Sequence, residues 1–540
     1  MKLEQTIQDF KEYLERINMF NEASAILSFD SETVAPPGSV KSRAKRAGFF
    51  ELEIFNMQTS TEMAAFLDAL EPKLETFDDY LKGMYRISKK AYDDGIKIPP
   101  ELVQEFEELT EEAVDVWKIA RAENDFKLFA PYLKRLVELQ KKMIDARRSL
   151  VKGNVETLLE VDSSNQSDDD SASLATKEQD RTHNYRAGGK SPYDILLNDY
   201  EFGMNIAVYD EFFSKIKATV VPLLKQIQQS KKKIEMDFVN IPVNLESQRR
   251  ISVFLANKLG YDLDRGYITE SVHPFCDSSN KYDVRITTRY LEADFLSSFF
   301  SIMHECGHAI YEQDIADDIA TTILGEGAST GIHEGSSRFY ENIIGRSMQF
   351  WEAIKDELMA YLPKDYEKIT PHLFYEAVNE VKPSLIRVEA DELTYNLHIM
   401  IRYEIERMLF NEDVDISELP LIWNQKYEEY LGITPPTFAE GILQDIHWAI
   451  GMFGYFPTYA LGSAYAAQIA FYMAKDFSIE ECIKDQDFYA ISQWLEAKIY
   501  QYGSTYTPDE LMKKSFGETI NVDYYISYLK DKFIKLYELD

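Results

Sequence analysis

A histidine–glutamate motif near the middle of the chain constrains its fold more than any other feature. Within residues 301–313, His304, Glu305 and His308 follow the pattern His-Glu-x-x-His. On an α-helix, residues four apart lie on one face about one turn apart, so the two histidines can offer their imidazole nitrogens to one metal ion. Glu305 would lie beside them, within reach of the proton of a metal-bound water. The motif therefore predicts a helix that carries a catalytic metal site.

The residues around the motif indicate that this helix is buried. Leu296, Phe300, His304 and His308 repeat every four residues, and this spacing gives a broad apolar face. Two histidines on such a face could also be polar groups satisfied inside a core, with no metal between them. A catalytic zinc site has three protein ligands and one open position, so the metal hypothesis requires a third ligand from another part of the chain.

Several candidates for this third ligand follow the motif, after a loop that contains glycines. A new helix is predicted to begin near Thr330. Four residues close to that point carry suitable side chains: Glu326, His333, Glu334 and Glu341. Glu334 lies in the first turn, where the loop would deliver it to the metal, but it could equally form an ion pair with Arg338 four residues later. Spacing alone leaves the choice open.

Composition excludes several classes of function. The chain has 540 residues, of which 45% are hydrophobic, and a formal net charge of −34. It is long enough for a large globular core, and its negative charge would repel the phosphates of nucleic acids and anionic membranes. Its three cysteines are far apart in sequence and predict neither a disulfide framework nor a cysteine zinc site. With no signal-peptide pattern and no apolar run of about 18 residues, we expect a cytoplasmic location.

Helical periodicity dominates the rest of the chain. Helices are predicted at roughly 39–71, 73–95, 99–154, 207–235, 245–259 and 375–410. Residues 265–290 alternate between apolar and polar, so a hairpin or small sheet with a turn at Cys276–Asn280 is expected next to the metal helix. Residues 161–191 form an acidic stretch. His183 and the aspartates there could suggest a second metal site, but an acidic flexible insertion is the favoured interpretation.

Five short signatures, in order along the chain, resemble those of the M32 metallocarboxypeptidases, the carboxypeptidase Taq family. They are Asp283-x-Arg285-x-Thr287, His304-Glu305-x-x-His308, His333-Glu334-Gly335, Ile386-Arg387-x-x-Ala390-Asp391 and Gly441-x-x-Gln444-Asp445-x-His447-Trp448. The resemblance covers nearly the whole chain. The family usually has Gln where this chain has Ser336, which affects a contact behind the metal and not the ligand set.

The resemblance implies a mainly α, large helical metallopeptidase fold with a deep substrate groove, together with the small β-sheet expected next to the metal helix. It implies one peptidase domain over 1–540, with an N-terminal helical part at 1–160, the insertion at 161–191 and a catalytic part at 192–540. A homodimer is usual in the family. The resemblance also implies Zn²⁺, with Co²⁺ also used in the family, held by His304, His308 and Glu334.

The activity implied is the release of C-terminal amino acids from peptides that have a free C-terminus. In this hypothesis Glu305 is the general base, and His447 and Tyr455 are candidate donors to the oxyanion that develops on the scissile carbonyl. Arg387 is the first choice to bind the substrate α-carboxylate and Arg285 the second, because a planar guanidinium can bind a carboxylate with two bonds. For Arg387, the simpler alternative is an ion pair with Asp391, four residues later.

Two other functions share much of this pattern. A metallo-oligopeptidase that cuts short peptides internally would use the same metal ligands. A non-catalytic peptide-binding protein would keep the fold without a working site, and the complete His304, Glu305, His308 and Glu334 set argues against it.

Overall fold

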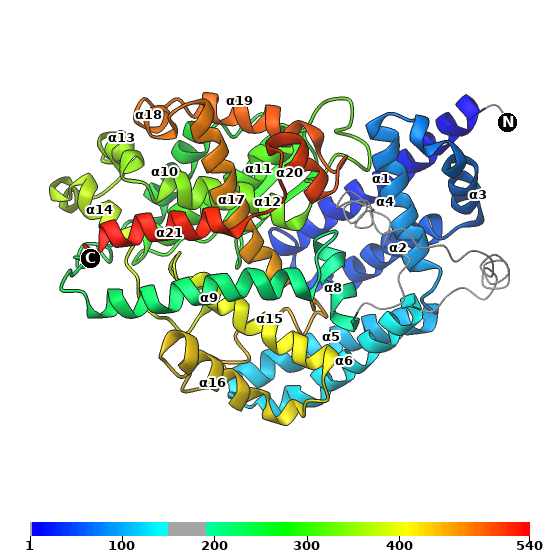
Figure 1. Ribbon diagram of the computed structural model, residues 1–540, viewed down its shortest axis with the longest axis horizontal. Coiled ribbons are helices and arrows are strands. Elements are labelled where there is room, and N and C mark those ends of the chain that lie inside the picture. The colour runs from blue at the N-terminus through cyan, green and yellow to red at the C-terminus, as the bar shows by residue number, and fades with distance from the viewer. Residues whose placement is uncertain (1–2, 149–190, 540) are drawn as a thin grey trace, which may run out of the picture. The chain divides into compact units, whose positions relative to one another are not determined.

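The structure, a computed structural model, describes residues 3–148 and 191–539. Helices make up most of this part of the chain, and its strands form one small sheet (Figure 1). The mainly α fold expected from the sequence is confirmed. The predicted acidic insertion, up to residue 190, and His183 within it lie outside the described residues.

The chain divides into two compact units. The first unit comprises Met1–Tyr92, Phe212–Ile399 and Thr458–Asp540, and the second comprises Asp93–Glu211 and Met400–Pro457. The His-Glu-x-x-His motif and the sheet belong to the first unit. His447 and Tyr455 belong to the second.

Most of the helices belong to the first unit. They are α1 (Leu3–Glu32), α2 (Val40–Gln58), α3 (Thr61–Leu70), α4 (Asp79–Gly95), α9 (Ile206–Gln229), α10 (Leu245–Leu259), α11 (Phe295–Gln313), α12 (Thr330–Arg338), α13 (Met348–Leu358), α14 (Pro371–Val378), α17 (Phe456–Asp476), α18 (Ile479–Lys484), α19 (Phe488–Lys498), α20 (Pro508–Phe516) and α21 (Val522–Leu536). A π-helical segment, η4 (Phe339–Gly345), continues directly from α12. Short 3₁₀ turns complete this unit: η1 (Pro37–Ser39), η2 (Glu71–Thr76), η5 (Lys364–Lys368), η6 (Arg387–Glu389) and η8 (Tyr500–Tyr502).

The second unit is also helical. Its elements are α5 (Pro100–Glu123), α6 (Phe126–Arg148), α8 (Pro192–Tyr200), most of α15 (Tyr395–Asn411), η7 (Ile416–Glu418) and α16 (Leu419–Leu431). Helices α5 and α6 form an antiparallel pair (Figure 1). They are joined at Asn124, which has a left-handed backbone with φ of 56°.

Two long helices predicted from the sequence are each two separate helices in the structure. The predicted helix at 39–71 is interrupted at Ser60, whose side chain accepts a hydrogen bond from the Met63 N–H and so begins α3. The predicted helix at 99–154 is interrupted at Asn124, because a left-handed residue ends an α-helix and asparagine tolerates that conformation. Each break depends on one capping residue, Ser60 or Asn124. The hydrophobic spacing on either side of that residue is unchanged, so periodicity alone does not reveal the break.

The three-stranded sheet has the order β1-β3-β2. Its strands are β1 (Gly266–Glu270), β2 (Cys276–Asn280) and β3 (Asp283–Thr288). Strand β3 pairs in parallel with β1 and antiparallel with β2, and Ile286 lies opposite both Ile268 and Cys276. The predicted sheet is confirmed, but the turn expected at Cys276–Asn280 is itself a strand. The reversal is tighter, because the Asn280 side chain accepts the Tyr282 N–H immediately after β2.

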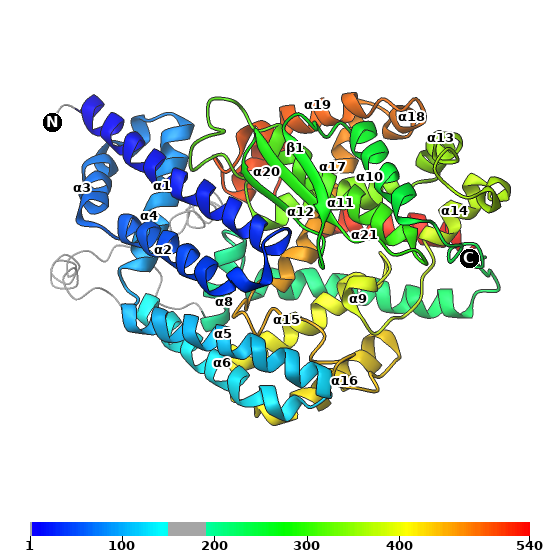
Figure 2. The ribbon, with the colours of Figure 1, turned by 180° about the vertical axis from the view of Figure 1, so that it is seen from behind.

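Helix α11, which carries the motif, is buried on nearly every side. Strands β2 and β3 pack against it, as do α10, α12 and η4 (Figure 2). Near its N-terminus, the Phe299 ring stacks on Trp351, with ring centres 5.2 Å apart. At Gly307 the helix approaches α12 so closely that a Cβ would lie 2.6 Å from the Ser337 Cα. Dense packing of this kind holds the motif rigidly.

The helix predicted at 375–410 is also interrupted. Helix α14 ends at Val378 and α15 begins at Tyr395, so the segment that contains Arg387 and Asp391 is a loop with one 3₁₀ turn. The Asp391 carboxylate accepts backbone N–H groups from Lys382, Leu393 and Thr394, which fixes this loop at the start of α15. Asp391 thus satisfies backbone N–H groups in the loop and just before α15, a contact that helical periodicity does not reveal.

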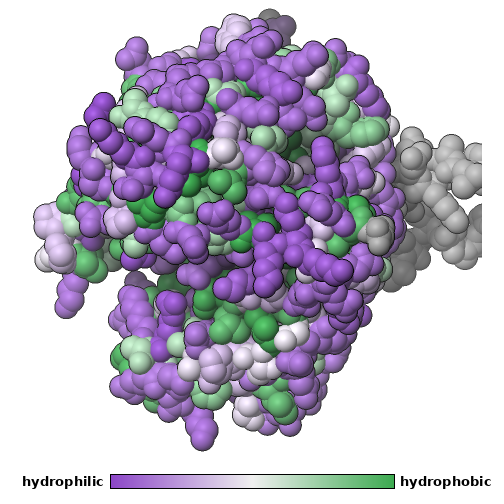
Figure 3. Space-filling view, turned by 90° about the vertical axis from the view of Figure 1, so that its left-hand side faces the viewer, coloured by the Kyte–Doolittle hydropathy of each residue, from purple (hydrophilic) through white to green (hydrophobic). Residues whose placement is uncertain are grey.

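Hydrophilic residues cover much of the face shown in Figure 3, with hydrophobic residues in smaller groups between them. Among the described residues, no helix combines the length and the apolar character that crossing a membrane requires.

Candidate metal centre

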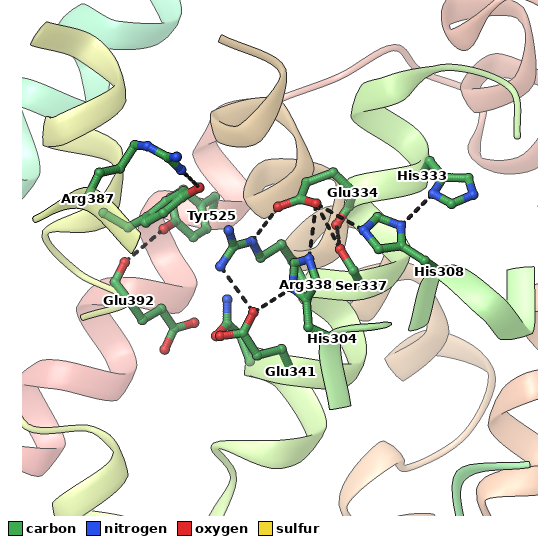
Figure 4. Close-up of polar contacts among 12 residues, drawn as sticks. His304, His308, His333, Glu334, Ser337, Arg338, Glu341, Arg387, Glu392 and Tyr525 are labelled. Atoms are coloured by element: carbon green, nitrogen blue, oxygen red, sulfur yellow. Dashed lines mark hydrogen bonds and ion pairs between the residues drawn. The ribbon is translucent and has the colours of Figure 1, made fainter. Parts of the chain in front are cut away.

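Three side chains from two helices converge on one point. His304 and His308 lie one turn apart on α11, and Glu334 lies at the middle of α12, one turn later than the first turn expected from the sequence (Figure 4). The Glu334 Oε2 atom is 3.5 Å from His304 Nε2 and 3.4 Å from His308 Nε2. Two imidazole nitrogens and one carboxylate oxygen therefore face the same small space.

This arrangement fits a divalent metal ion. Zinc binds imidazole nitrogen and carboxylate oxygen at about 2.0–2.2 Å, so neighbouring ligand atoms of a tetrahedral site lie about 3.3 Å apart. The separations of 3.5 and 3.4 Å between Glu334 Oε2 and the two Nε2 atoms match that spacing. Within the described part of the chain, the set His304, His308 and Glu334 brings its ligand atoms within 4.8 Å of one another. Three ligands leave one position open, as a catalytic site requires.

The other candidates for the third ligand take different positions. Glu341 lies 2.9 Å from Nδ1 of His304, the nitrogen that faces away from Glu334. His333 contacts Nδ1 of His308 in the same way. Glu326 is exposed in the loop that precedes α12. Glu334 is thus the candidate that faces the two Nε2 atoms, and Glu341 and His333 lie behind the histidines.

Glu334 forms the ion pair with Arg338 that its sequence position suggested, and its other oxygen faces the two histidines. Arg338 donates through Nε to Glu334 Oε1 at 2.7 Å, and the Ser337 hydroxyl donates to Oε2 at 3.1 Å. One oxygen is therefore held by the guanidinium while the other faces the histidines. Burial opposes ionisation of Glu334, but Arg338 and His304 outweigh it and hold its pKa well below the ordinary value. The carboxylate is charged and oriented, as a metal ligand must be.

The two histidines have different electrostatic surroundings. Burial favours the neutral form of both rings. For His304, the carboxylates of Glu334 and Glu341 outweigh burial and raise its pKa well above the ordinary value. For His308, burial lowers the pKa to about 3. A metal ion would replace the proton on His304, because a ligating imidazole must offer a free lone pair.

Glu341 is the carboxylate that orients His304. It lies between Arg338, at 3.1 Å from one oxygen, and Arg346, at 3.1 Å from the other. Burial opposes its ionisation, but Arg338, His304 and Arg346 hold its pKa below the ordinary value. It lies in the π-helical segment η4, a geometry found often at functional sites.

Glu305, the residue expected to act as general base, is 6% exposed. Burial raises its pKa to about 7, although the neighbouring His304 opposes this. A carboxyl group that titrates near neutral pH can both accept and release a proton, which is what acid–base catalysis requires.

The two arginines proposed to bind a substrate carboxylate differ in their contacts. Arg285 donates through Nε and Nη2 to both oxygens of Asp283, at 2.7 and 2.6 Å, so its planar fork is already engaged within its own strand. Arg387 donates to the Tyr395 hydroxyl at 3.2 Å, and its Cζ lies 5.0 Å from the centre of the Tyr459 ring. In Figure 4 it lies on the far side of Glu334 from His333. These contacts favour Arg387 over Arg285 as the residue that would bind the substrate carboxylate.

His447 and Tyr455 lie close together in the second unit, with ring centres 5.8 Å apart. The segment that carries them is held by α15 of the same unit. Arg402 donates to the Asp445 carboxylate at 2.6–2.7 Å. One turn later, Glu406 accepts the Trp448 indole N–H at 2.8 Å. These hydrogen bonds to α15 therefore fix the segment that carries His447 and Tyr455.

Sequence reasoning missed several residues that shape the site. Gly462 of α17 packs directly on Glu334, since a Cβ there would lie 2.2 Å from the Glu334 Cγ. The run of small residues at 460–467 is the signal that could have indicated this close approach. Arg346 was missed as well, and no local pattern marks it.

A buried helix that carries His-Glu-x-x-His, with a carboxylate from the next helix facing both imidazoles, is typical of helical metallopeptidases. The sequence profile of the carboxypeptidase Taq (M32) metallopeptidases matches residues 9–171 and 169–533. The carboxypeptidase 1 of Bacillus subtilis is 40% identical over 533 residues, which cover 98% of this chain and 99% of the relative. The crystal structure of the M32 carboxypeptidase from Deinococcus radiodurans R1 matches with a TM-score of 0.87 at 29% identity, over 99% of this chain and 100% of that one. The chain belongs to the carboxypeptidase Taq (M32) metallopeptidase family, whose members hydrolyse peptide bonds.

Proposed function

We propose that this enzyme releases amino acids from the C-terminal end of peptides, with a divalent metal held by His304, His308 and Glu334. The convergence of Glu334 Oε2 on both Nε2 atoms, at 3.4 and 3.5 Å, is the observation that supports this function most directly. Relatives that match nearly the whole chain are named carboxypeptidases. Zn²⁺ is the proposed ion and Co²⁺ the alternative, because imidazole and carboxylate ligands suit both.

A divalent cation at this site would supply Lewis-acid chemistry, polarising the scissile carbonyl and lowering the pKa of water. Glu305 accepts the proton of the attacking water and then delivers it to the leaving amine. Its pKa of about 7, raised by burial, suits both steps. His447 and Tyr455 are proposed to donate to the oxygen on which negative charge develops.

Arg387 is proposed to bind the free α-carboxylate of the substrate. Its guanidinium is buried and oriented by the Tyr395 hydroxyl, and a buried guanidinium binds a carboxylate more strongly than one exposed to water. Amidation of the C-terminus would remove the negative charge that this guanidinium is proposed to bind. Recognition of the chain end therefore separates an exopeptidase from an enzyme that cuts internally.

Product analysis on a hexapeptide tests the reaction. We expect stepwise loss of single residues from the free acid and little hydrolysis of the same peptide with an amidated C-terminus. Two fragments appearing at once would establish the metallo-oligopeptidase instead. A protein with no stoichiometric metal and no hydrolysis would establish a non-catalytic peptide-binding role.

The Glu305→Gln variant tests the general base. It should keep the metal and lose turnover by a factor of 10²–10⁴, the range typical for a positioned acid–base group. The exposed Glu352 on α13 provides a matched control, and Glu352→Gln should behave like the parent. Near-normal turnover of Glu305→Gln would remove Glu305 from this role.

We further propose that both units act as one peptidase domain in a cytoplasmic homodimer. The family profile matches residues from both units, and Cys276, Cys306 and Cys482 are free thiols, as a reducing compartment favours. Sedimentation of the purified protein at several concentrations tests the dimer.

A further inference from the structure

A series of hydrogen bonds leads from the proposed ligand His308 away from the metal. Its Nδ1 contacts Nδ1 of His333, and Nε2 of His333 lies 2.6 Å from Glu312 Oε1. The Ser278 hydroxyl of β2 donates to the other oxygen of Glu312 at 3.2 Å. Glu312 is 5% exposed and lies one turn beyond His308 on α11. His308, His333 and Glu312 thus form a partly buried relay between α11 and α12.

Glu312, the last member of this relay, determines which nitrogen donates and which accepts in each hydrogen bond. An ionised carboxylate can only accept, so His333 donates its Nε2–H to Glu312. A neutral imidazole carries one N–H, so the His333 Nδ1 is then an acceptor. The His308 Nδ1 must therefore be the donor, and the lone pair of His308 lies on Nε2, which faces Glu334. This is the tautomer that a metal ligand at Nε2 requires.

The opposite set of roles would disable the ligand. If His333 carried its proton on Nδ1, His308 would have to accept it there. The His308 proton would then lie on Nε2 and point into the metal site. When His333 is neutral, the ionised Glu312 prevents this, because it leaves His333 no acceptor role at Nε2.

The His333 ring has little freedom to leave this position. It stacks on Tyr311, with ring centres 5.2 Å apart, and on His308 at 4.5 Å. On another side Gly327 lies so close that a Cβ there would be 2.5 Å from the His333 Cδ2. Packing therefore holds the ring where both of its nitrogens meet their partners.

We propose that His333 and Glu312 are positioning residues that hold His308 in its metal-binding tautomer. The two histidines are then oriented by different means: a carboxylate contacts His304 directly through Glu341, and a carboxylate acts on His308 through an intervening imidazole. This role rests on the proposed metal site, and it concerns retention of the ion rather than contact with substrate.

Metal affinity of a His333→Phe variant tests the proposal. Phenylalanine keeps an aromatic ring between Tyr311 and His308 but removes both nitrogens. We expect the dissociation constant for Zn²⁺, measured by chelator competition, to rise 10- to 100-fold, and loss of the ion to a chelator to become faster. The control is His372→Phe, since His372 also pairs with a glutamate, Glu376, but is 60% exposed on α14. It should bind Zn²⁺ as the parent does.

A second variant shows whether the two residues act in series. Glu312→Gln keeps the shape of the side chain but can donate as well as accept, so the tautomer is no longer imposed. Its Zn²⁺ affinity should fall less than that of His333→Phe, and the double variant should be no weaker than His333→Phe alone.

Melting of the metal-free proteins separates this role from a purely structural one. A structural role would lower the melting temperature of the apo-proteins and leave Zn²⁺ affinity unchanged. Zn²⁺ affinities of both single variants within twofold of the parent would overturn the relay while leaving the metal site intact. A parent protein that binds no metal at all would instead overturn the proposed function. If His333→Phe does not fold, Glu312→Gln alone decides.

Discussion

Gly462 and Glu334 are packed against each other so tightly that no side chain fits between them. A Cβ on Gly462 would lie 2.2 Å from the Glu334 Cγ and 2.7 Å from its Cβ. The next residue on α12, Gly335, meets α17 in a similar way, with a Cβ 2.9 Å from that of Tyr465. The backbone of α17 therefore forms the wall that holds the proposed carboxylate ligand toward the histidines.

We predict that Gly462→Ala displaces Glu334 and weakens metal binding. The added methyl group cannot be accommodated without moving α12 or α17, and overpacking of this kind typically costs 1–3 kcal/mol. Metal content after gel filtration and the melting temperature measure the two effects. Gly48→Ala in α2 is the control, because no atom lies within 4 Å of its Cβ, and it should be neutral or stabilising.

Replacing Arg387 by alanine should mainly affect peptides with a free C-terminus. The side chain is 6% exposed, and a bidentate charged contact in such a site contributes on the order of 2–3 kcal/mol. We expect kcat/KM for free-acid peptides to fall about 30- to 150-fold, with little change for amidated peptides. Steady-state kinetics on matched peptide pairs measure this.

Arg285→Ala provides the comparison, because Asp283 already occupies its fork. We expect a smaller loss of kcat/KM, equal for free acids and amides. A loss specific to free acids in Arg285→Ala, and not in Arg387→Ala, would reverse the assignment of the two arginines.

Removal of the metal should abolish turnover and lower the melting temperature. A bound ion would link Glu334 of α12 to His304 and His308 of α11, so its removal would take away a cross-link between the two helices. A ligand present at 1,000 times its dissociation constant stabilises the folded state by about 4 kcal/mol, so the effect should be measurable. Dialysis against a chelator followed by addition of Zn²⁺ or Co²⁺ should restore both properties, and activity that survives complete chelation would contradict a metal mechanism.

The sequence was most informative where structure depends on near neighbours. Helix α11 and the facing of His304 and His308 follow from residues four apart, so their spacing was sufficient. The small sheet beside α11 followed from alternation at 265–290. Glu334 remained one of four candidates until the resemblance favoured it, because a loop whose course does not follow from local pattern separates it from the histidines in sequence.

Features that depend on distant contacts were not predictable from local pattern. The break between α14 and α15 depends on Asp391, which accepts N–H groups from both sides of the loop. Gly462 reaches Glu334 across more than a hundred residues of sequence. The strand β2 pairs with β3 although Asp277, Ser278 and Asn280 have low strand propensity, because the neighbouring strand supplies its hydrogen bonds.

A buried carboxyl group in the second unit predicts how stability varies with pH. Glu406 is fully buried and accepts hydrogen bonds from Tyr193, Trp448 and the Gly454 N–H. Burial raises its pKa to about 7, although these hydrogen bonds oppose the shift. The corresponding value in an unfolded chain is 4.5. Between these values the folded protein keeps a proton that the unfolded chain has released.

Because the folded state binds more protons in this window, the free energy of unfolding should fall as the pH rises from about 4.5 to about 7. The contribution of Glu406 to this fall is on the order of 3 kcal/mol, since one pKa unit corresponds to about 1.4 kcal/mol. Glu406→Gln isolates it, because the amide does not titrate. Urea denaturation at pH 5 and pH 8 should show that the stability advantage of the parent over the variant shrinks at the higher pH. An advantage that is equal at both pH values would show that Glu406 titrates as it does in the unfolded chain.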